Sequence, residues 1–137
     1  KDNVELAINS AKGVIERNLK NSDITNIKLE EKVIKTLSSM RYGKNKDGYF
    51  FAYKWDKNGN YYFAFHGVKS RLNGKKTDIY KPDVKGKVFR AKLIKKGKNG
   101  GGFVTYHYKK PSTGKIAPKL AYAQLLPKLN WVIVTGV

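Results

Sequence analysis

The 137-residue chain contains no cysteine and only two histidines. Without cysteine there is no disulfide framework and no thiolate metal site, and two imidazoles are too few for a histidine-rich metal centre. The sequence also lacks a nucleophile elbow, a P-loop, a zincin motif and a dinucleotide-binding glycine motif. We therefore expect a binding protein rather than an enzyme, and we expect no cofactor.

Long apolar runs are absent as well. No stretch approaches the roughly 20 apolar residues that span a bilayer, and no signal peptide precedes Lys1. The chain does not begin with methionine, and residues 131–137 stop inside a strand-like pattern. We expect residues 1–137 to form one domain, a fragment of a longer protein whose targeting and membrane segments lie outside it.

Acidic residues are scarce: 10 stand against 29 lysines and arginines, which gives a formal net charge of +19. Such a field attracts nucleic acid, anionic lipid and small carboxylates alike. The basic residues are scattered, with no run of five or more, whereas a nucleic-acid arm carries a block of like charge. A lysine-rich solvated surface is the simpler interpretation.

The first 40 residues have the periodicity of two amphipathic helices. The first helix has one apolar stripe, formed by Val4, Ile8, Ala11, Ile15 and Leu19. Residues 18–25 read as a break, with Thr25 or Asn26 as the cap of the second helix. The second helix has its own stripe, formed by Leu29, Val33, Leu37 and Met40.

The remainder of the chain reads mainly as strands. Runs rich in aromatic and β-branched residues occupy residues 49–53, 61–66, 103–108, 116–126 and 131–137. Residues 67–82 have no clear period and are long for a plain loop, which is typical of a lid or binding loop. A short helix is expected to begin at residues 82–84 and to end at Gly97. The fold class is therefore α+β: a five-stranded antiparallel sheet with a long N-terminal helix, a second helix and a short helix between strands 2 and 3.

The first two predicted strands are aromatic on both faces. Asn58-Gly59 lies between them and is a strong hairpin signal. In the first strand, alternation puts Phe50 and Phe51 on opposite faces, and in the second it separates Phe63 and Phe65 from His66. Aromatic residues on both faces predict a sheet that is covered on both sides.

Two cations are candidate ligands for an anion. Gly43 is a suitable helix stop, which puts Arg41 and Tyr42 in the last turn of the second helix, just before the aromatic strand. The planar guanidinium of Arg41 can bind both oxygens of a carboxylate, or it can cap the carbonyls of its own helix. Lys119 lies inside a strand-like run, although a snorkelling edge lysine is an alternative for it.

Aromatic side chains supply the rest of a candidate pocket. Tyr49, Tyr106 and Tyr122 can present hydroxyls from neighbouring strands, and Phe51 can supply an apolar wall. Each tyrosine is about equally well explained as a core aromatic whose hydroxyl reaches solvent or backbone. Each histidine taken alone is more simply a structural residue than a ligand.

Several short motifs occur in a recognisable order. They are Arg41-Tyr42 followed by Asp47-Gly48-Tyr49-Phe50-Phe51, then His66, then Gly101-Gly102-Phe103-Val104 with Tyr106, then Pro118-Lys119-Leu120-Ala121-Tyr122, and finally Asn130-Trp131-Val132-Ile133-Val134-Thr135-Gly136-Val137. With these motifs the chain resembles the single Cache sensor domains, the extracytoplasmic ligand-binding modules of bacterial chemoreceptors and sensor kinases. Each motif is weak alone, but together they are specific, and the resemblance covers roughly residues 4–137.

The resemblance implies a PAS-like fold in the periplasmic part of an inner-membrane receptor, above all a methyl-accepting chemotaxis protein. It implies transmembrane helices outside the fragment, a homodimer formed through the N-terminal helix, and a small organic anion such as pyruvate, lactate, acetate or propionate as ligand. Matched position by position, the ligand-binding residues are Arg41, Tyr49, Phe51, His66, Tyr106, Lys119 and Tyr122.

Each of these residues has an expected role. Arg41, His66 and Lys119 would neutralise the carboxylate, the tyrosines would orient it, and Phe51 would limit its length. One departure is Gly67, which follows His66 where the family commonly has proline.

The alternative is a basic nucleic-acid-binding module, in which exposed aromatics stack on bases and lysines contact phosphates. The charge and the aromatic content favour it. The absence of an RNP-like or helix-turn-helix pattern, and the aromatics on both faces of the strands, count against it. We therefore expect no nucleic-acid partner.

Overall fold

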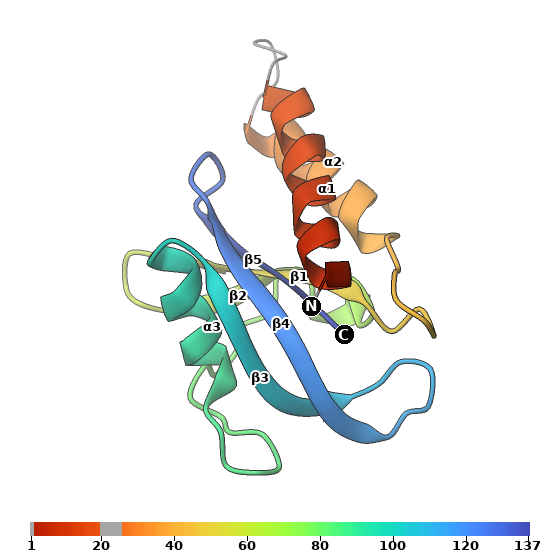
Figure 1. Cartoon of the computed structure of the whole chain (residues 1–137). Coiled ribbons are helices and arrows are strands. Elements are labelled where there is room, and N and C mark those ends of the chain that lie inside the picture. The colour runs from red at the N-terminus through yellow and green to blue at the C-terminus, as the bar shows by residue number, and fades with distance from the viewer. Residues whose placement is uncertain (1, 20–25) are drawn as a thin grey trace.

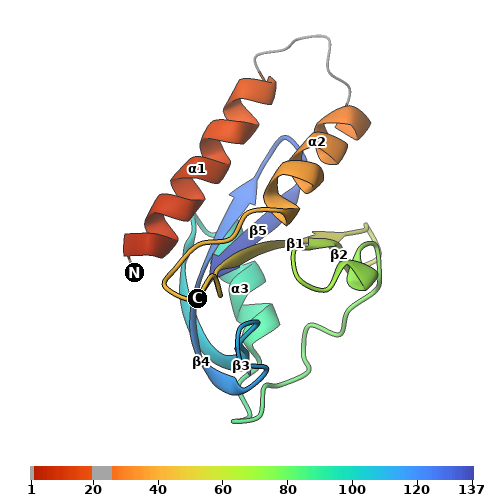
Figure 2. The ribbon, with the colours of Figure 1, turned by 90° about the vertical axis from the view of Figure 1, so that its right-hand side faces the viewer.

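The computed structural model describes residues 2–19 and 26–137. A five-stranded antiparallel sheet forms the middle layer, with helices α1 and α2 across one face and α3 against the other (Figures 1 and 2). The elements in chain order are α1 (Asp2–Leu19), α2 (Asn26–Ser38), β1 (Tyr49–Trp55), β2 (Tyr61–His66), the 3₁₀ helix η1 (Ser70–Leu72), α3 (Phe89–Lys98), β3 (Gly102–Lys109), β4 (Ile116–Leu126) and β5 (Trp131–Gly136). The expected α+β architecture is confirmed. Within the described ranges, no helix is long and apolar enough to cross a membrane.

The strands lie in the order β2-β1-β5-β4-β3, so β1 and β5 are neighbours near the centre of the sheet. They pair antiparallel, with Phe51 opposite Val134. β3 forms one edge and pairs with β4, where Tyr106 is opposite Lys119. Because the central strands are buried on both faces, their sequences read as continuous apolar and aromatic runs.

Both faces of the sheet are covered by helices, as the aromatic pattern predicted. The stripes of α1 and α2 are buried on the first face, where they contribute Val4, Ile8, Ala11, Ile15, Leu29, Val33 and Leu37. All of them except Val4 belong to the same core as Phe50 and Trp131 of the sheet. On the second face, Leu93 and Ile94 of α3 share a core with Tyr49. Full burial of such side chains contributes about 1.5–3 kcal/mol each, so these two cores hold the layers together.

A β-bulge in β2 changes which residues share a face. Phe63 and Phe65 pair with consecutive residues of β1, so Ala64 is an extra residue between them. The prediction that Phe63 and Phe65 share a face is therefore wrong, and they belong to the cores on opposite faces. The bulge also turns His66 to the face of Phe51, its direct partner on β1.

α2 ends at Ser38 rather than at Tyr42. Tyr42 instead forms a β-bridge with Gly48, in which the two backbones exchange hydrogen bonds of 3.2 and 2.9 Å. The Tyr42 hydroxyl also lies 2.8 Å from Thr135 Oγ1. These contacts draw the chain out of the helix, so the prediction that Arg41 and Tyr42 lie in the last helical turn is wrong.

The expected break between the first two helices falls at residues 18–25. α1 continues to Leu19, and α2 begins at Asn26. Residues 20–25, including the proposed cap Thr25, lie outside the described residues.

α3 begins at Phe89 and not at residues 82–84. The carboxylate of Asp83 accepts hydrogen bonds from the backbone N–H groups of Lys85 and Lys87, which folds this stretch into a turn. Farther along, α3 lies very close to β5 at Gly97. A Cβ at Gly97 would lie 2.5 Å from Val132 Cγ1, so only glycine allows this close approach.

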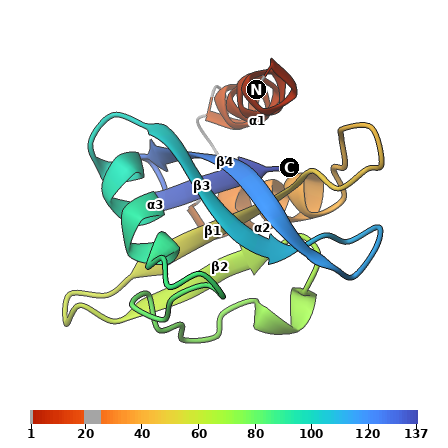
Figure 3. The ribbon, with the colours of Figure 1, turned by 60° about the horizontal axis from the view of Figure 1, so that its bottom comes forward.

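Residues 67–88, called the strap below, join β2 to α3. The strap pairs along the outer edge of β2 and returns to the start of α3 (Figure 3). At its first residue, the Gly67 N–H donates to the Phe50 carbonyl at 2.8 Å, a bond that proline could not form. The strap thus borders the face of the sheet that α3 covers.

Candidate functional site

Five of the predicted ligand-binding residues converge on the face of the sheet that α3 covers. They are Tyr49 and Phe51 of β1, His66 of β2, Tyr106 of β3 and Lys119 of β4. Strand alternation places Tyr49 and Phe51 together, and the bulge adds His66. Tyr106 and Lys119 meet because they are opposite each other in the β3–β4 pairing. Four strands therefore build one cluster of side chains.

Lys119 lies at the centre of this cluster. Its Nζ atom is 3.9 Å from the ring centroid of Tyr49, 5.2 Å from that of Phe51 and 5.8 Å from that of Tyr106. The residue is 7% exposed, so it is not a snorkelling edge lysine. Ring faces attract a cation, but Nζ has no hydrogen-bond partner among the described residues. An ammonium group buried without an acceptor destabilises the folded state.

Burial lowers the pKa of Lys119 from 10.5 to about 7, and the positive charge of Lys69 contributes to the same shift. Desolvation disfavours the charged form of an amine, and a nearby cation acts in the same direction. Lys119 therefore exchanges its proton near neutral pH, and an acceptor placed beside it would favour the charged form.

His66 contributes a hydrogen-bond donor rather than a charge. Burial lowers its pKa to about 3, and Lys119 is the largest of the cationic contributions to that shift. Its Nδ1 accepts hydrogen bonds from the backbone N–H groups of Val68 at 3.2 Å and Lys69 at 2.9 Å. The proton of the neutral ring therefore lies on Nε2. The expectation that His66 neutralises a carboxylate does not fit this environment.

Arg41 lies at the rim of the cluster and is exposed. Its guanidinium donates to the carbonyls of Ser38 at 3.0 Å, Met40 at 2.9 Å and Gly67 at 2.6 Å. Arg41 thus binds carbonyls at the end of α2, the alternative considered from the sequence, and it also fixes the residue that follows His66. Its charge opposes the effect of burial on the pKa of Tyr49.

Tyr122 is not brought into the cluster. It packs with the core on the α1 and α2 side of the sheet, where its ring meets Phe103 edge-on at 4.9 Å. Its hydroxyl lies 3.4 Å from Gln124 Oε1. Tyr122 lies on the opposite face from Lys119 because the two residues are three positions apart in one strand, and side chains alternate between faces along a strand.

Several other side chains complete the site. They are Tyr53, Phe63, Phe89, Arg90 and Tyr108, which line the same cavity as Tyr49 and His66. Tyr108 was signalled by its position two residues after Tyr106, on the same face of β3. Phe89 stacks on Tyr106 with a centroid distance of 4.1 Å, and Arg90 lies over the Phe89 ring. No local pattern in the sequence pointed to these α3 residues.

The cavity among these rings is almost filled by the side chains. Its volume is about 10 Å³, which is room for about one water molecule. Burial raises the pKa values of Tyr49, Tyr53 and Tyr106, so their hydroxyls are neutral donors. A carboxylate with two or three carbons would need these side chains, or the strap, to move.

The strap is fastened to the edge strand beside this cavity. Asp83 Oδ2 accepts the backbone N–H of His107 on β3 at 2.8 Å. Lys69 Nζ donates to the Tyr108 hydroxyl at 3.1 Å. These two contacts hold the strap against β3.

An Asp83→Ala variant should loosen the strap. It leaves the N–H groups of Lys85, Lys87 and His107 without their acceptor. We expect amide hydrogen exchange at these positions to rise by about tenfold or more, because they then open without global unfolding. Asp78→Ala is a matched control, since Asp78 accepts one turn hydrogen bond, from Tyr80. Equal exchange in the two variants would show that Asp83 does not fasten the strap.

The family model described as a Cache domain matches residues 14–137. The chain belongs to the Cache domain family. The resemblance drawn from the sequence is confirmed, and with it the expectation of an extracytoplasmic sensor domain.

Two curated relatives are signalling proteins. The sensor histidine kinase MctS of Rhizobium johnstonii is 41% identical over 109 residues, which make up 79% of this chain and 22% of that protein. The methyl-accepting chemotaxis protein CtpM of Pseudomonas aeruginosa is 31% identical over 135 residues, or 98% of this chain and 22% of that protein. The Cache chain thus spans about a fifth of the length of these relatives.

Solved structures share the fold. A methyl-accepting chemotaxis protein from Vibrio parahaemolyticus superposes with a TM-score of 0.74 at 30% identity, covering 97% of this chain and 81% of that one. A periplasmic sensor domain of a chemotaxis protein gives a TM-score of 0.82 at 21% identity, covering 98% and 91%. A Cache chemosensory domain described for carboxylic acid recognition gives 0.78 at 22% identity, covering 98% and 89%. At these last two identities the likeness concerns the fold alone.

Proposed function

We propose that this Cache domain senses a small organic anion, a monocarboxylate of two or three carbons such as acetate, propionate, lactate or pyruvate. The observation that carries the proposal is Lys119, a buried amine with no hydrogen-bond partner in the described part of the chain. A carboxylate beside Nζ would supply the missing acceptor and pair with the charge. The Cache domain described for carboxylic acid recognition supports the ligand class by analogy.

The surrounding side chains have complementary roles in this proposal. Lys119 neutralises the carboxylate, while His66 Nε2–H and the hydroxyls of Tyr49 and Tyr106 donate hydrogen bonds to it. Phe51, 5.2 Å from Nζ, limits the length of the apolar tail. Arg41 acts indirectly by holding the Gly67 carbonyl. Tyr122 has no role, since it lies on the other face.

Binding would move the strap and α3, because the cavity holds only about one water molecule. Next to Lys119, Leu120 exchanges two backbone hydrogen bonds of 3.0 Å with Val137 at the end of β5. The start of α1 and the end of β5 lie near each other in two views (Figures 1 and 2). A change at Lys119 therefore has a short path to both segments, and a ligand that prefers one arrangement shifts the population toward it.

The complete protein would be a transmembrane receptor, above all a methyl-accepting chemotaxis protein, with spanning helices outside this domain. Dimerisation through α1 is part of the proposal. Leu6 on α1 is 66% exposed and is therefore accessible to a second copy of the chain.

Isothermal titration calorimetry with acetate, propionate, lactate and pyruvate tests the proposed ligand class. We expect saturable binding of at least one of them, and weaker binding of succinate, whose second carboxylate would find no further buried lysine or arginine among the described residues. A ligand at 100 times its Kd should stabilise the domain by about 2.7 kcal/mol and raise its Tm by several degrees. If none of the four binds to protein freed of ligand by unfolding and refolding, the monocarboxylate proposal is overturned.

The nucleic-acid alternative is not favoured by the site. It requires exposed aromatic rings to stack on bases. Tyr49, Phe51, Tyr53 and Tyr106 are all buried beneath α3. The rings that drew attention in the sequence are therefore not available to a base.

A further inference from the structure

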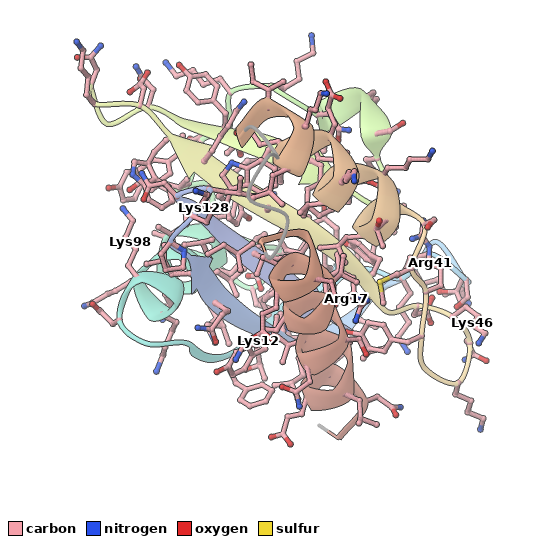
Figure 4. All side chains as sticks on the ribbon, turned by 90° about the horizontal axis from the view of Figure 1, so that it is seen from above. Lys12, Arg17, Arg41, Lys46, Lys98 and Lys128 are labelled. Carbon is pink, nitrogen blue, oxygen red and sulfur yellow. The ribbon has the colours of Figure 1, made fainter. Side chains whose placement is uncertain are left out.

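Neither the fold nor the proposed ligand explains why the domain is so basic. Much of the charge is spread over the surface: in the view of Figure 4, Lys98 and Lys128 lie on one side of the molecule and Arg41 and Lys46 on the other. One group of lysines, in contrast, converges on an open groove between α3 and the edge strand β3. The groove has a volume of about 610 Å³, which lies in the usual range of small-molecule sites.

The groove is lined by one sign of charge. Lys87, Lys92, Lys95 and Lys96 form one side, and residues 99–105 contribute to the rest; no acidic residue lines it. Lys92, Lys95 and Lys96 are spaced three and four positions apart, so they share one side of α3. Within the described part of the chain, no hydrogen bond or ion pair joins these ammonium groups to an acid. Like charges at this spacing destabilise a helix unless an anion relieves them.

Gly102 allows one of these lysines to lie across the groove. A Cβ at Gly102 would be 2.9 Å from Lys96 Cδ, so any larger residue would displace that side chain. The aliphatic part of Lys96 therefore rests on the start of β3. Lys96 lines the groove together with Lys92 and Lys95.

We propose that this groove is a second anion site, which binds a small molecule carrying two or more clustered phosphate or carboxylate groups. It differs from the Lys119 site in the charge it offers. Lys119 is a buried cation without a hydrogen-bond partner among the described residues, which suits a monoanion. The groove offers four mobile point charges in an open space, which suits a larger polyvalent anion.

The two sites share a helix. Phe89 and Arg90, at the start of α3, line the cavity beside Tyr49 and His66, whereas Lys92, Lys95 and Lys96 line the groove. An anion in the groove would hold α3 in one position and thereby change the affinity of the carboxylate site. This consequence rests on the proposed function, but the existence of the second site does not.

Calorimetry with pyrophosphate and with citrate tests the second site. The test variant carries Lys92→Gln, Lys95→Gln and Lys96→Gln, and the control variant carries Lys54→Gln, Lys57→Gln and Lys115→Gln. Both lose the same charge from exposed positions. We expect the groove variant to bind pyrophosphate about tenfold or more weakly, and the control variant to bind it within about twofold of the wild type. Amide NMR shifts on titration should concentrate in α3 and at residues 99–105.

These experiments distinguish binding in the groove from attraction to the net charge of the domain and from binding at Lys119. Equal weakening in the two variants would show that pyrophosphate responds only to the net charge, which overturns the proposal. Absence of saturable binding of both probes would overturn it too, as would tight binding of a single-stranded oligonucleotide alone. Pyrophosphate binding should persist in Lys119→Met, so failure of the carboxylate proposal leaves this result unaffected.

Discussion

A Lys119→Met domain should lose its affinity for short carboxylates and yet, at pH 6, unfold at a higher temperature than the wild type. Methionine has a similar volume and fills the same space among the rings, but it carries no charge that must be buried. The lowering of the Lys119 pKa from 10.5 to about 7 corresponds to a few kcal/mol, because one pKa unit is about 1.4 kcal/mol. A gain of that size raises the Tm by several degrees or more.

Thermal unfolding and calorimetry of the same variant check both halves of this expectation. Lys54→Met is the matched control, since Lys54 is an exposed lysine of β1. Its stability should stay within about 0.5 kcal/mol of the wild type. If the Lys119→Met domain binds the carboxylate normally, Lys119 is not part of the binding site. A variant that binds nothing and is also less stable would indicate that the amine stabilises the fold through contacts other than those described.

The affinity for the carboxylate should fall as the pH rises above about 7. The ligand stays ionised throughout this range, so Lys119 is the group that changes. In the ligand-free domain its pKa is about 7, and the bound anion raises that pKa by favouring the charged form. Binding then takes up a proton, and the affinity decreases by up to about tenfold per pH unit until the pKa of the complex is reached.

Stability without ligand should change with pH in the opposite direction. The unfolded chain keeps the Lys119 proton up to about pH 10.5, while the folded domain loses it near pH 7. In that window the unfolded state binds more protons, so the contribution of Lys119 to stability rises with pH. The advantage of Lys119→Met over the wild type should therefore shrink between pH 7 and pH 10.

Calorimetric titrations from pH 6 to pH 9 test this expectation for the affinity. Lys69→Gln provides the control, because the Lys69 charge helps to lower the pKa of Lys119. In that variant the loss of affinity should begin at a higher pH. An affinity that stays constant from pH 6 to pH 9 would mean that the ligand pairs with a cation other than Lys119, such as Arg41.

The arrangement of the two cores could be predicted from the sequence because it depends on the periodic spacing of apolar residues within each helix and strand. The stripe of Ile8, Ala11 and Ile15 faces the sheet, and the aromatic runs of β1 and β2 predicted cover on both sides. Lys119 was distinguished from the other lysines because it interrupts a strand. These inferences need only the spacing of residues within one element.

The features that the sequence did not predict depend on contacts between distant segments. The bridge of Tyr42 with Gly48 ends α2 early and leaves Arg41 to bind carbonyls. The bulge at Ala64 brings His66 to the site, although strict alternation separates it from Phe63. Neither contact produces a periodic pattern in the sequence from which it could be predicted.

Tyr122 is a different case. Its spacing from Lys119 already placed the two side chains on opposite faces of β4, yet the family motif had grouped them. Alternation within the strand was the better guide to the geometry. Tyr108, which the motif omitted, follows the alternation and lies 5.4 Å from Lys119 Nζ.

A crystal structure of the domain with the carboxylate that binds most tightly would test the role of Lys119 most directly. We expect a carboxylate oxygen about 2.7–2.9 Å from Lys119 Nζ, the distance of a charge-assisted hydrogen bond. We also expect its tail to lie against Phe51 and the strap to be displaced from β3. A carboxylate bound at Arg41 or in the α3–β3 groove, with Lys119 Nζ still without an acceptor, would contradict the assignment of the sensing site.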